Sequence, residues 1–131
     1  MQNILVDNSS WISYFKSKNN KITSFIDDAL DACTACVNNV VLAELIPVLS
    51  AQKEYELVDL MNSLTNIPLN INWQEIIRFQ GKNIKNGINR VGIPDLIILQ
   101  NVTQNSLQLF SLDKHFELMR NINKFDLIKL S

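Results

Sequence analysis

Short apolar runs alternate along the chain with longer amphipathic stretches, which predicts strands and helices in turn. Within the longer stretches, apolar residues recur at the spacing of one helix face, as Ile22, Phe25 and Ile26 do. The expected strands are residues 3–6, 33–37, 67–69, 107–111 and 125–130, and the expected helices lie at about residues 11–15, 22–30, 40–52, 55–64, 73–85, 94–105 and 114–121. Because strands that alternate with helices form parallel sheets, the pattern predicts an α/β fold in one domain, residues 1–131.

Four acidic residues interrupt or end these apolar runs. They are Asp7 in ILVD, Glu44 in VVLAEL, Asp95 in GIPDLIIL and Asp113 in LFSLD. A lone carboxylate among apolar neighbours is costly to bury, and it would take up a proton or move to solvent. Four such carboxylates in one small chain indicate that they share a positive counter-charge. Carboxylates without histidine or thiolate partners favour hard cations, so we expect a site for Mg²⁺ or Mn²⁺.

The predicted elements place the four acids at one edge of the sheet. Asp7 and Asp113 follow strands, at the carboxyl ends where open α/β sheets bind ligands. Asp95 opens a helix, and Glu44 lies about one turn into the helix after the second strand. The sequence is thus consistent with convergence of all four acids, and the strand order behind it is itself inferred.

This arrangement suits metal-assisted hydrolysis of a phosphodiester bond. We expect Asp7, Asp95 and Asp113 to be the metal ligands. Glu44 would be a further ligand or the general base for the attacking water. Ser9, two residues after Asp7, would hydrogen-bond a neighbouring carboxylate and fix its rotamer.

Each residue also has an ordinary structural interpretation. Asp7 and Asp113 could be helix N-caps, and Ser9 could be another cap residue. Asp95 could favour a helix dipole, and Glu44 could be a solvated helix position. The combination of four acids therefore carries the prediction, and no single member does.

Composition narrows the class of protein. With 47% hydrophobic and 19% charged residues, a chain of 131 residues can bury a hydrophobic core without the help of disulfides or a structural metal. A net charge of -1 is unlike that of a general polyanion binder, so contact with nucleic acid must use a local patch. The sequence shows neither a signal peptide nor an apolar stretch long enough to span a bilayer, so we expect a cytoplasmic protein without membrane contact.

The two cysteines, Cys33 and Cys36, have a C-x-x-C spacing. Because no second Cys/His pair accompanies them, we interpret them as small buried residues in a reducing compartment rather than as a redox or zinc pair.

The blocks DNSSWISYF, NVVLAELI, GIPDLIIL and LFSLDKHF, in this order, resemble the four signature blocks of the PIN-domain family. Within that family they are most similar to the VapC toxins of toxin–antitoxin pairs, and the resemblance covers essentially the whole chain. It implies a three-layer α/β/α fold with a mostly parallel sheet of about five strands. It also implies a Mg²⁺- or Mn²⁺-dependent endoribonuclease, a homodimer, and a cognate antitoxin across the active-site groove. The resemblance also implies the roles of five residues. The positions of the family's acidic quartet are taken by Asp7, Glu44, Asp95 and Asp113, and Ser9 takes the position of the supporting hydroxyl.

RNA contact is expected at single-stranded or loop nucleotides. Phosphate contacts could come from Lys82, Lys85, Arg90 and Lys114, although solvated surface explains each equally well. His115, beside Asp113, could touch RNA, but a partly exposed surface residue is the favoured interpretation.

Several aromatic residues follow the first acid. Trp11, Tyr14 and Phe15 have helical spacing, which favours core or partner contact over base stacking. An apolar groove for an antitoxin helix could be formed by Trp11, Phe15, Phe25, Leu57 and Met61.

Three other functions stay open. A PIN nuclease of RNA processing would have no antitoxin, and a degenerate PIN-like module would only bind RNA or protein; the four retained acids argue against the latter. A Mg²⁺-dependent phosphatase would need a second Asp two residues after its nucleophile, where this chain has Ser9.

Overall fold

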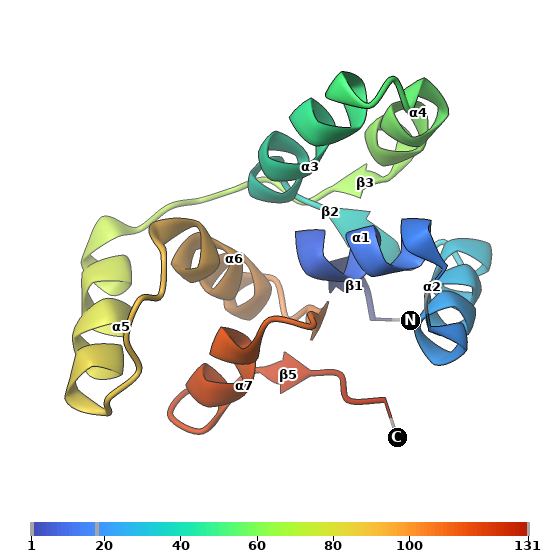
Figure 1. Cartoon of the computed structure of the whole chain (residues 1–131). Helices are drawn as coiled ribbons and strands as arrows, with labels where there is room; N and C mark the ends of the chain where they lie inside the picture. The colour runs from blue at the N-terminus through green and yellow to red at the C-terminus, as the bar shows by residue number, and fades with distance from the viewer. Residues whose placement is uncertain (1, 18, 131) are drawn as a thin grey trace.

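The sheet is parallel throughout. The computed structural model describes residues 2–17 and 19–130; Met1, Lys18 and Ser131, which belong to the predicted domain 1–131, lie outside the described residues. The strands are β1 (Ile4–Val6), β2 (Ala35–Val37), β3 (Thr65–Asn66), β4 (Gln108–Phe110) and β5 (Asp126–Leu127). They pair side by side in the order β3-β2-β1-β4-β5, and every pairing is parallel (Figure 1). The α/β fold predicted from the sequence is confirmed.

Seven helices connect the strands in the described part of the chain. They are α1 (Asn8–Lys16), α2 (Asn20–Asp31), α3 (Asn39–Ala51), α4 (Tyr55–Ser63), α5 (Trp73–Lys85), α6 (Ile93–Gln104) and α7 (Lys114–Arg120). Each predicted helix is present. None of these helices is long and apolar enough to cross a membrane.

Three predicted strand positions are corrected by the backbone. Cys33 has a φ of 59°, which a strand does not allow, so β2 begins only at Ala35. The third strand lies at Thr65–Asn66 instead of residues 67–69, because polar, exposed residues form it and the apolar run follows it. It does lie at the sheet edge, as Pro68 predicted, and Ile67 still donates a backbone hydrogen bond to Val37 at 2.8 Å. The last strand is shortened from residues 125–130 to Asp126–Leu127.

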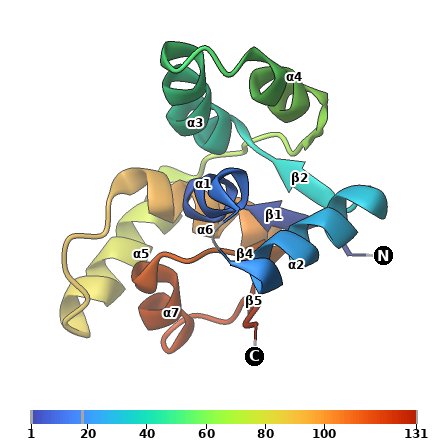
Figure 2. The same ribbon diagram turned by 45° about the vertical axis from the view of Figure 1, so that its right-hand side comes forward.

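Helices cover both faces of this sheet. Strands β1 and β2 are buried at every residue, as expected for parallel strands packed on two sides. The chain runs outward from β1 to β3, then crosses back to β4 and on to β5, and crossovers of one hand in these two directions cover opposite faces of the sheet. Figure 2 shows α1 and α2 in front of β1, with α6 behind it.

A buried amide pair ties the second strand's end to the opposite helix layer. Asn38, fully buried, caps α3 through its Oδ1, which accepts from the backbone N–H of Val41 at 3.0 Å. Its Nδ2 donates to Oδ1 of Asn101 on α6 at 3.0 Å, and Asn101 Nδ2 donates to the carbonyl of Pro68 at 3.0 Å. The pair therefore sets the position of α3, which carries Glu44, against α6, which carries Asp95.

Replacing Asn101 with leucine should lower the free energy of unfolding by about 1–3 kcal/mol, because Asn38 and the Pro68 carbonyl would lose a buried partner. Denaturant unfolding measures the loss. The matched control is Asn62→Leu at an exposed position of α4, where we expect a change within about 0.5 kcal/mol. Equal stability of the two variants would contradict the role given to the pair.

Candidate active site

The site lies between β1 and β4, where the strand order reverses. The chain leaves β1 toward β2 on one side and returns to β4 on the other, so the helices following these two strands diverge and leave a crevice. Asp7 follows β1 directly, and Ser111, Leu112 and Asp113 connect β4 to α7. The topology therefore places the ends of two separate acidic sequence blocks beside each other.

Asp7 is the most enclosed of the acids, with 5% of its surface exposed. Its Oδ1 accepts from the Ser9 hydroxyl at 2.7 Å and from the Ser10 backbone N–H at 3.1 Å, which makes Asp7 the N-cap of α1. Its Oδ2 accepts a short hydrogen bond from the Ser111 hydroxyl. Burial raises the pKa of Asp7, and these hydrogen bonds oppose that rise because they stabilise the carboxylate.

Two serines connect the first acid to the loop after β4. Ser111 Oγ donates to Asp7 and accepts from the backbone N–H of Asp113 at 3.0 Å. Ser9 Oγ also donates to Asp7, and it accepts from the backbone N–H of Leu112 at 3.0 Å. The rotamer of Asp7 and the path of the loop are thereby fixed by the same two hydroxyl groups.

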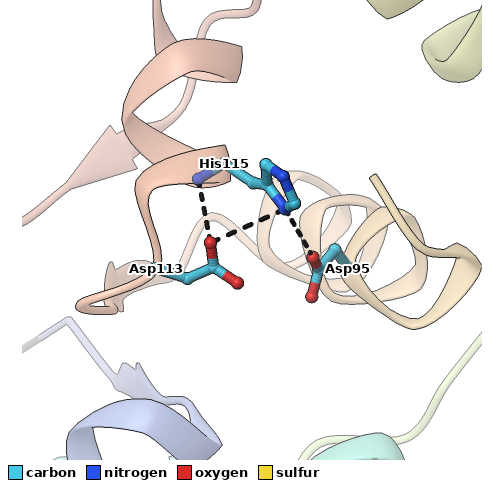
Figure 3. Close-up of side chains that lie close together, drawn as sticks. All are labelled: Asp95, Asp113 and His115. Atoms are coloured by element: carbon cyan, nitrogen blue, oxygen red, sulfur yellow. Dashed lines mark hydrogen bonds and ion pairs between the residues drawn. The ribbon is translucent and has the colours of Figure 1, made fainter. Parts of the chain in front are cut away.

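Asp95 and Asp113 face a histidine from two different helices. Asp95 lies in the first turn of α6, and Asp113 is the N-cap of α7, its Oδ1 accepting from the His115 backbone N–H at 2.9 Å. Nδ1 of His115 lies 3.5 Å from Asp95 Oδ2 and 3.6 Å from Asp113 Oδ1 (Figure 3). One ligand atom from each of these three residues lies within 4.8 Å of the others.

Glu44 lies on the exposed side of α3, within electrostatic reach of the other acids. Its pKa is raised by partial burial and then by the negative charges of Asp95, Asp7 and Asp113. The pKa of Asp95 is raised as well, by burial first and then by Asp113, with His115 acting in the opposite direction. The four acids therefore lie within electrostatic reach of one another.

The donor set fits a divalent cation. Burial raises the pKa of Glu44 and Asp95, repulsion from the neighbouring carboxylates raises it further, and a bound cation would relieve that repulsion. The geometry differs from the expected ligand set, because Asp7 does not belong to the described group of three close ligand atoms and His115 does. Asp7 has three of its four lone-pair positions used by Ser9, Ser10 and Ser111, which leaves one position on Oδ2.

The structure leaves the predicted phosphate contacts as separate surface positions. Lys82 and Lys85 lie in the last turn of α5, Arg90 lies in the loop before α6, and Lys114 begins α7. All four are exposed. Of these, only Lys114 adjoins a site acid in sequence, so their contact with RNA stays a prediction.

The apolar groove proposed for an antitoxin helix is wrong in two of its members. Trp11 and Met61 are fully buried in the core, so they cannot line a surface groove. Phe15, Phe25 and Leu57 are half-buried. Trp11 stacks on Phe15 with ring centroids 5.8 Å apart, which supports the interpretation of these rings as core.

The interpretation of the C-x-x-C pair is half right. Cys36 is buried, and its Sγ lies 3.3 Å from the carbonyl oxygen of Ile4. Cys33 is exposed and lies in the turn that follows α2. Both are free thiols.

Sequence reasoning missed Ser111, and it considered His115 only as a possible RNA contact. Ser111 stands two residues before Asp113, as Ser9 stands two residues after Asp7, and that mirrored spacing was an available signal. His115 stands two residues after Asp113, where an N-cap places the side chain at the start of a helix beside the capping carboxylate. Its approach to Asp95 depends on tertiary packing and has no signal in the sequence.

Comparison with known proteins identifies the class. The family model of the PIN domain matches residues 4–122, so the chain belongs to the PIN-domain family, which is a family of nucleases. No protein of curated function matches the chain in sequence.

The solved structures that share the fold include toxin–antitoxin complexes. A chain of DNA-bound VapBC from Salmonella typhimurium is 18% identical with a TM-score of 0.75, and the match covers 98% of both chains. VapBC2 from Rickettsia felis, bound to a promoter DNA fragment, gives 16% identity, a TM-score of 0.75 and 98% coverage of both chains. VapBC-1 from nontypeable Haemophilus influenzae gives 16% identity and a TM-score of 0.69, and the match covers 95% of this chain and 96% of the other. At these identities the likeness is one of fold, and it confirms the predicted PIN-like architecture.

Asp95→Asn should raise the melting temperature of the metal-free protein at neutral pH. Because the pKa of Asp95 is raised above its ordinary value of 3.8, the folded state binds the proton more tightly than the unfolded state, and stability falls as pH rises through this window. The gain from the variant is therefore present at neutral pH, shrinks as pH falls toward 3.8, and is absent below it.

Thermal unfolding in EDTA across this pH range measures the effect. Asp59→Asn, an exposed position on α4, is the control, and we expect little change from it. A lower melting temperature for Asp95→Asn than for the wild type at neutral pH would show that repulsion at the site is outweighed by the helix N-terminus and His115.

Proposed function

We propose that the chain is a divalent-metal-dependent endoribonuclease and that it acts as the toxin of a type II toxin–antitoxin pair. The observation that carries the proposal is the convergence of Asp7, Glu44, Asp95 and Asp113 on the crevice between β1 and β4. Charge gathered in this way is unfavourable for the protein alone and suits a reaction in which a cation and a phosphate meet.

The residues divide into ligands, an orienting group and a base. Asp95 and Asp113 would hold Mg²⁺ or Mn²⁺, with Asp7 contributing through the free position on its Oδ2. When bound, the cation would supply Lewis-acid chemistry, lowering the pKa of a water and neutralising charge on the phosphate. Ser9 and Ser111 hold the Asp7 carboxylate in one orientation.

Glu44 is suited to take a proton from the attacking water. It lies on the exposed side of the crevice, and its raised pKa brings its basicity closer to neutral pH than an ordinary carboxylate's. Glu44 is exposed whereas Asp7 is buried, and this difference supports a role for Glu44 as the base and for Asp7 as a ligand.

Substrate access is supported by a cavity beside Asp113, the one site acid that lines it. The cavity has a volume of about 490 Å³ and is lined in part by Asp113, Ser111, Leu112, Lys21 and Lys129. Exposed Leu112 offers an apolar surface for a base. Lys129 lies 3.9 Å from Glu117, which also lines the cavity, so a phosphate would have to compete with that carboxylate for its charge. We propose that RNA flanking the scissile bond lies here, and the tentative contacts Lys82, Lys85, Arg90 and Lys114 would add to it only if the RNA extends around the crevice.

The toxin assignment rests on the four sequence blocks and on the fold shared with VapBC chains. From it we propose a cognate antitoxin, a homodimer and a cytoplasmic location. The exposed apolar residues Trp73, Ile77 and Ile84 share one side of α5, and a second copy of the chain could bury them. A monomeric mass in light scattering, at the 15.0 kDa of one chain, would count against the dimer.

The purified protein should cleave RNA with Mg²⁺ or Mn²⁺ and lose that activity in EDTA. Asp95→Asn should lower the cleavage rate by about 10²-fold or more, since preorganised charge at an active site is worth that much. Asp59→Asn, which leaves the site intact, is the matched control and should cleave at the wild-type rate. Equal cleavage by Asp95→Asn, or cleavage insensitive to EDTA, would eliminate the proposed site.

A toxin and a nuclease of RNA processing differ in their effect on a cell. Production of the wild-type chain in bacteria should arrest growth, Asp95→Asn should not, and co-production of a small protein encoded beside this gene should restore growth. Normal growth with abundant, active wild-type protein would favour the RNA-processing alternative. A folded protein that binds RNA without cleaving it would favour the binding module.

A further inference from the structure

His115, and not Asp7, joins Asp95 and Asp113 in the group of close ligand atoms. Nδ1 lies 3.5 Å from Asp95 Oδ2 and 3.6 Å from Asp113 Oδ1, and Figure 3 shows it facing both carboxylates. Asp7, the residue expected in that group, is instead hydrogen-bonded to Ser9, Ser10 and Ser111. The three closest ligand atoms of the site are therefore two oxygens and one nitrogen.

The helix start fixes the position of the ring. The backbone N–H of His115 donates to Asp113 Oδ1 at 2.9 Å, so the capping bond holds the histidine and its neighbouring carboxylate in one arrangement. The next residue, Phe116, is fully buried and anchors the first turn of α7 in the core. The ring itself is 30% exposed, but its Nδ1 atom is buried and has no hydrogen-bond partner.

The distances favour a shared ligand over a simple ion pair. Charge-assisted N–H···O bonds are about 2.7–2.9 Å long, and both Nδ1···O separations are well beyond that. Two donor atoms that each lie about 2.1 Å from one cation are separated by roughly 3–4 Å, depending on the angle between them. The observed separations fall in that interval, with a buried nitrogen lone pair or proton that nothing else satisfies.

We propose that His115 is a ligand of the metal in this site, through Nδ1, together with Asp95 and Asp113. The proposal rests on the proposed function, since it concerns the same cation. Its consequence is a change in selectivity. Carboxylate oxygens alone suit Mg²⁺, whereas an imidazole nitrogen suits divalent transition ions, so this chain should prefer Mn²⁺ to Mg²⁺ more strongly than an all-carboxylate site does.

The test measures binding on the purified full-length chain, without RNA. Calorimetry gives the affinities for Mn²⁺ and for Mg²⁺ in the wild type, in His115→Gln, which offers an amide oxygen instead of the nitrogen, and in His115→Phe. The matched control is Glu117→Gln, which removes an exposed charge from the same helix. Circular dichroism establishes that each variant is folded.

The expected result is a selective loss. In both His115 variants the ratio of Mn²⁺ to Mg²⁺ affinity should fall roughly tenfold or more, since loss of even an outer partner of a metal site costs about 10- to 100-fold. Glu117→Gln should keep the wild-type ratio. Pulsed electron paramagnetic resonance of bound Mn²⁺ should show coupling to a directly bound ¹⁴N nucleus in the wild type and lose it in both His115 variants.

Two results would overturn the proposal, and they are distinguishable. If Mn²⁺ binds with no ¹⁴N coupling and with the same selectivity in all variants, His115 is not a ligand, while the proposed nuclease stands as long as Asp95→Asn abolishes metal binding. If the folded wild type binds neither ion, the metal site and the metal-dependent function fail together.

Discussion

Repulsion among the acids at the edge between β1 and β4 is the constraint on which the rest of the site depends. Four carboxylates in one field would ordinarily be selected against, because each raises the cost of ionising the next. The chain offsets the cost differently for each acid. Asp7 receives three hydrogen bonds, Asp95 lies in the first turn of a helix facing His115, and Glu44 remains toward solvent. Burial and then the remaining repulsion raise the pKa of Glu44 and Asp95, and a bound cation would lower the cost of ionising both.

The same residues act in the fold and in the site. Asp7 caps α1 and Asp113 caps α7, so the ordinary interpretation of these two acids is correct, and it is compatible with the proposed role in the site. A capping carboxylate lies at the start of its helix, which in this fold directly follows the end of a strand. Open α/β sheets bind ligands at the same strand ends. The asparagine pair Asn38 and Asn101 extends the arrangement, because it ties the helix of Glu44 to the helix of Asp95. The helices that position Asp7 and Asp113 are thus stabilised at their N-termini by these same carboxylates.

The sequence predicted the helices, and the places of Asp7, Asp95 and Asp113 at element ends, well because both depend on local chemistry. Periodicity and cap residues determine where α5 begins and ends, and a carboxylate in an apolar run is visible without coordinates. It predicted β3 poorly, because a polar two-residue edge strand is defined by its partner and carries no apolar pattern of its own. The misplacement of Trp11 and Met61 in a groove has a similar cause. Helical spacing shows that two residues share a face, but not whether that face meets solvent or the core.

The ligand set depends on contacts between distant parts of the chain, which explains why His115 was undervalued. Asp95 and His115 approach each other only because α6 and α7 both begin at the crevice, and Asp7 is hydrogen-bonded to Ser111, which is 104 residues away in sequence. The bond between Ser111 and Asp7 also crosses from β1 to β4, the pairing around which the strand order reverses. The site therefore exists only after the least local strand pairing in the sheet has formed. A partly folded chain that contained every acid in its helices and strands would still lack the geometry that holds a cation.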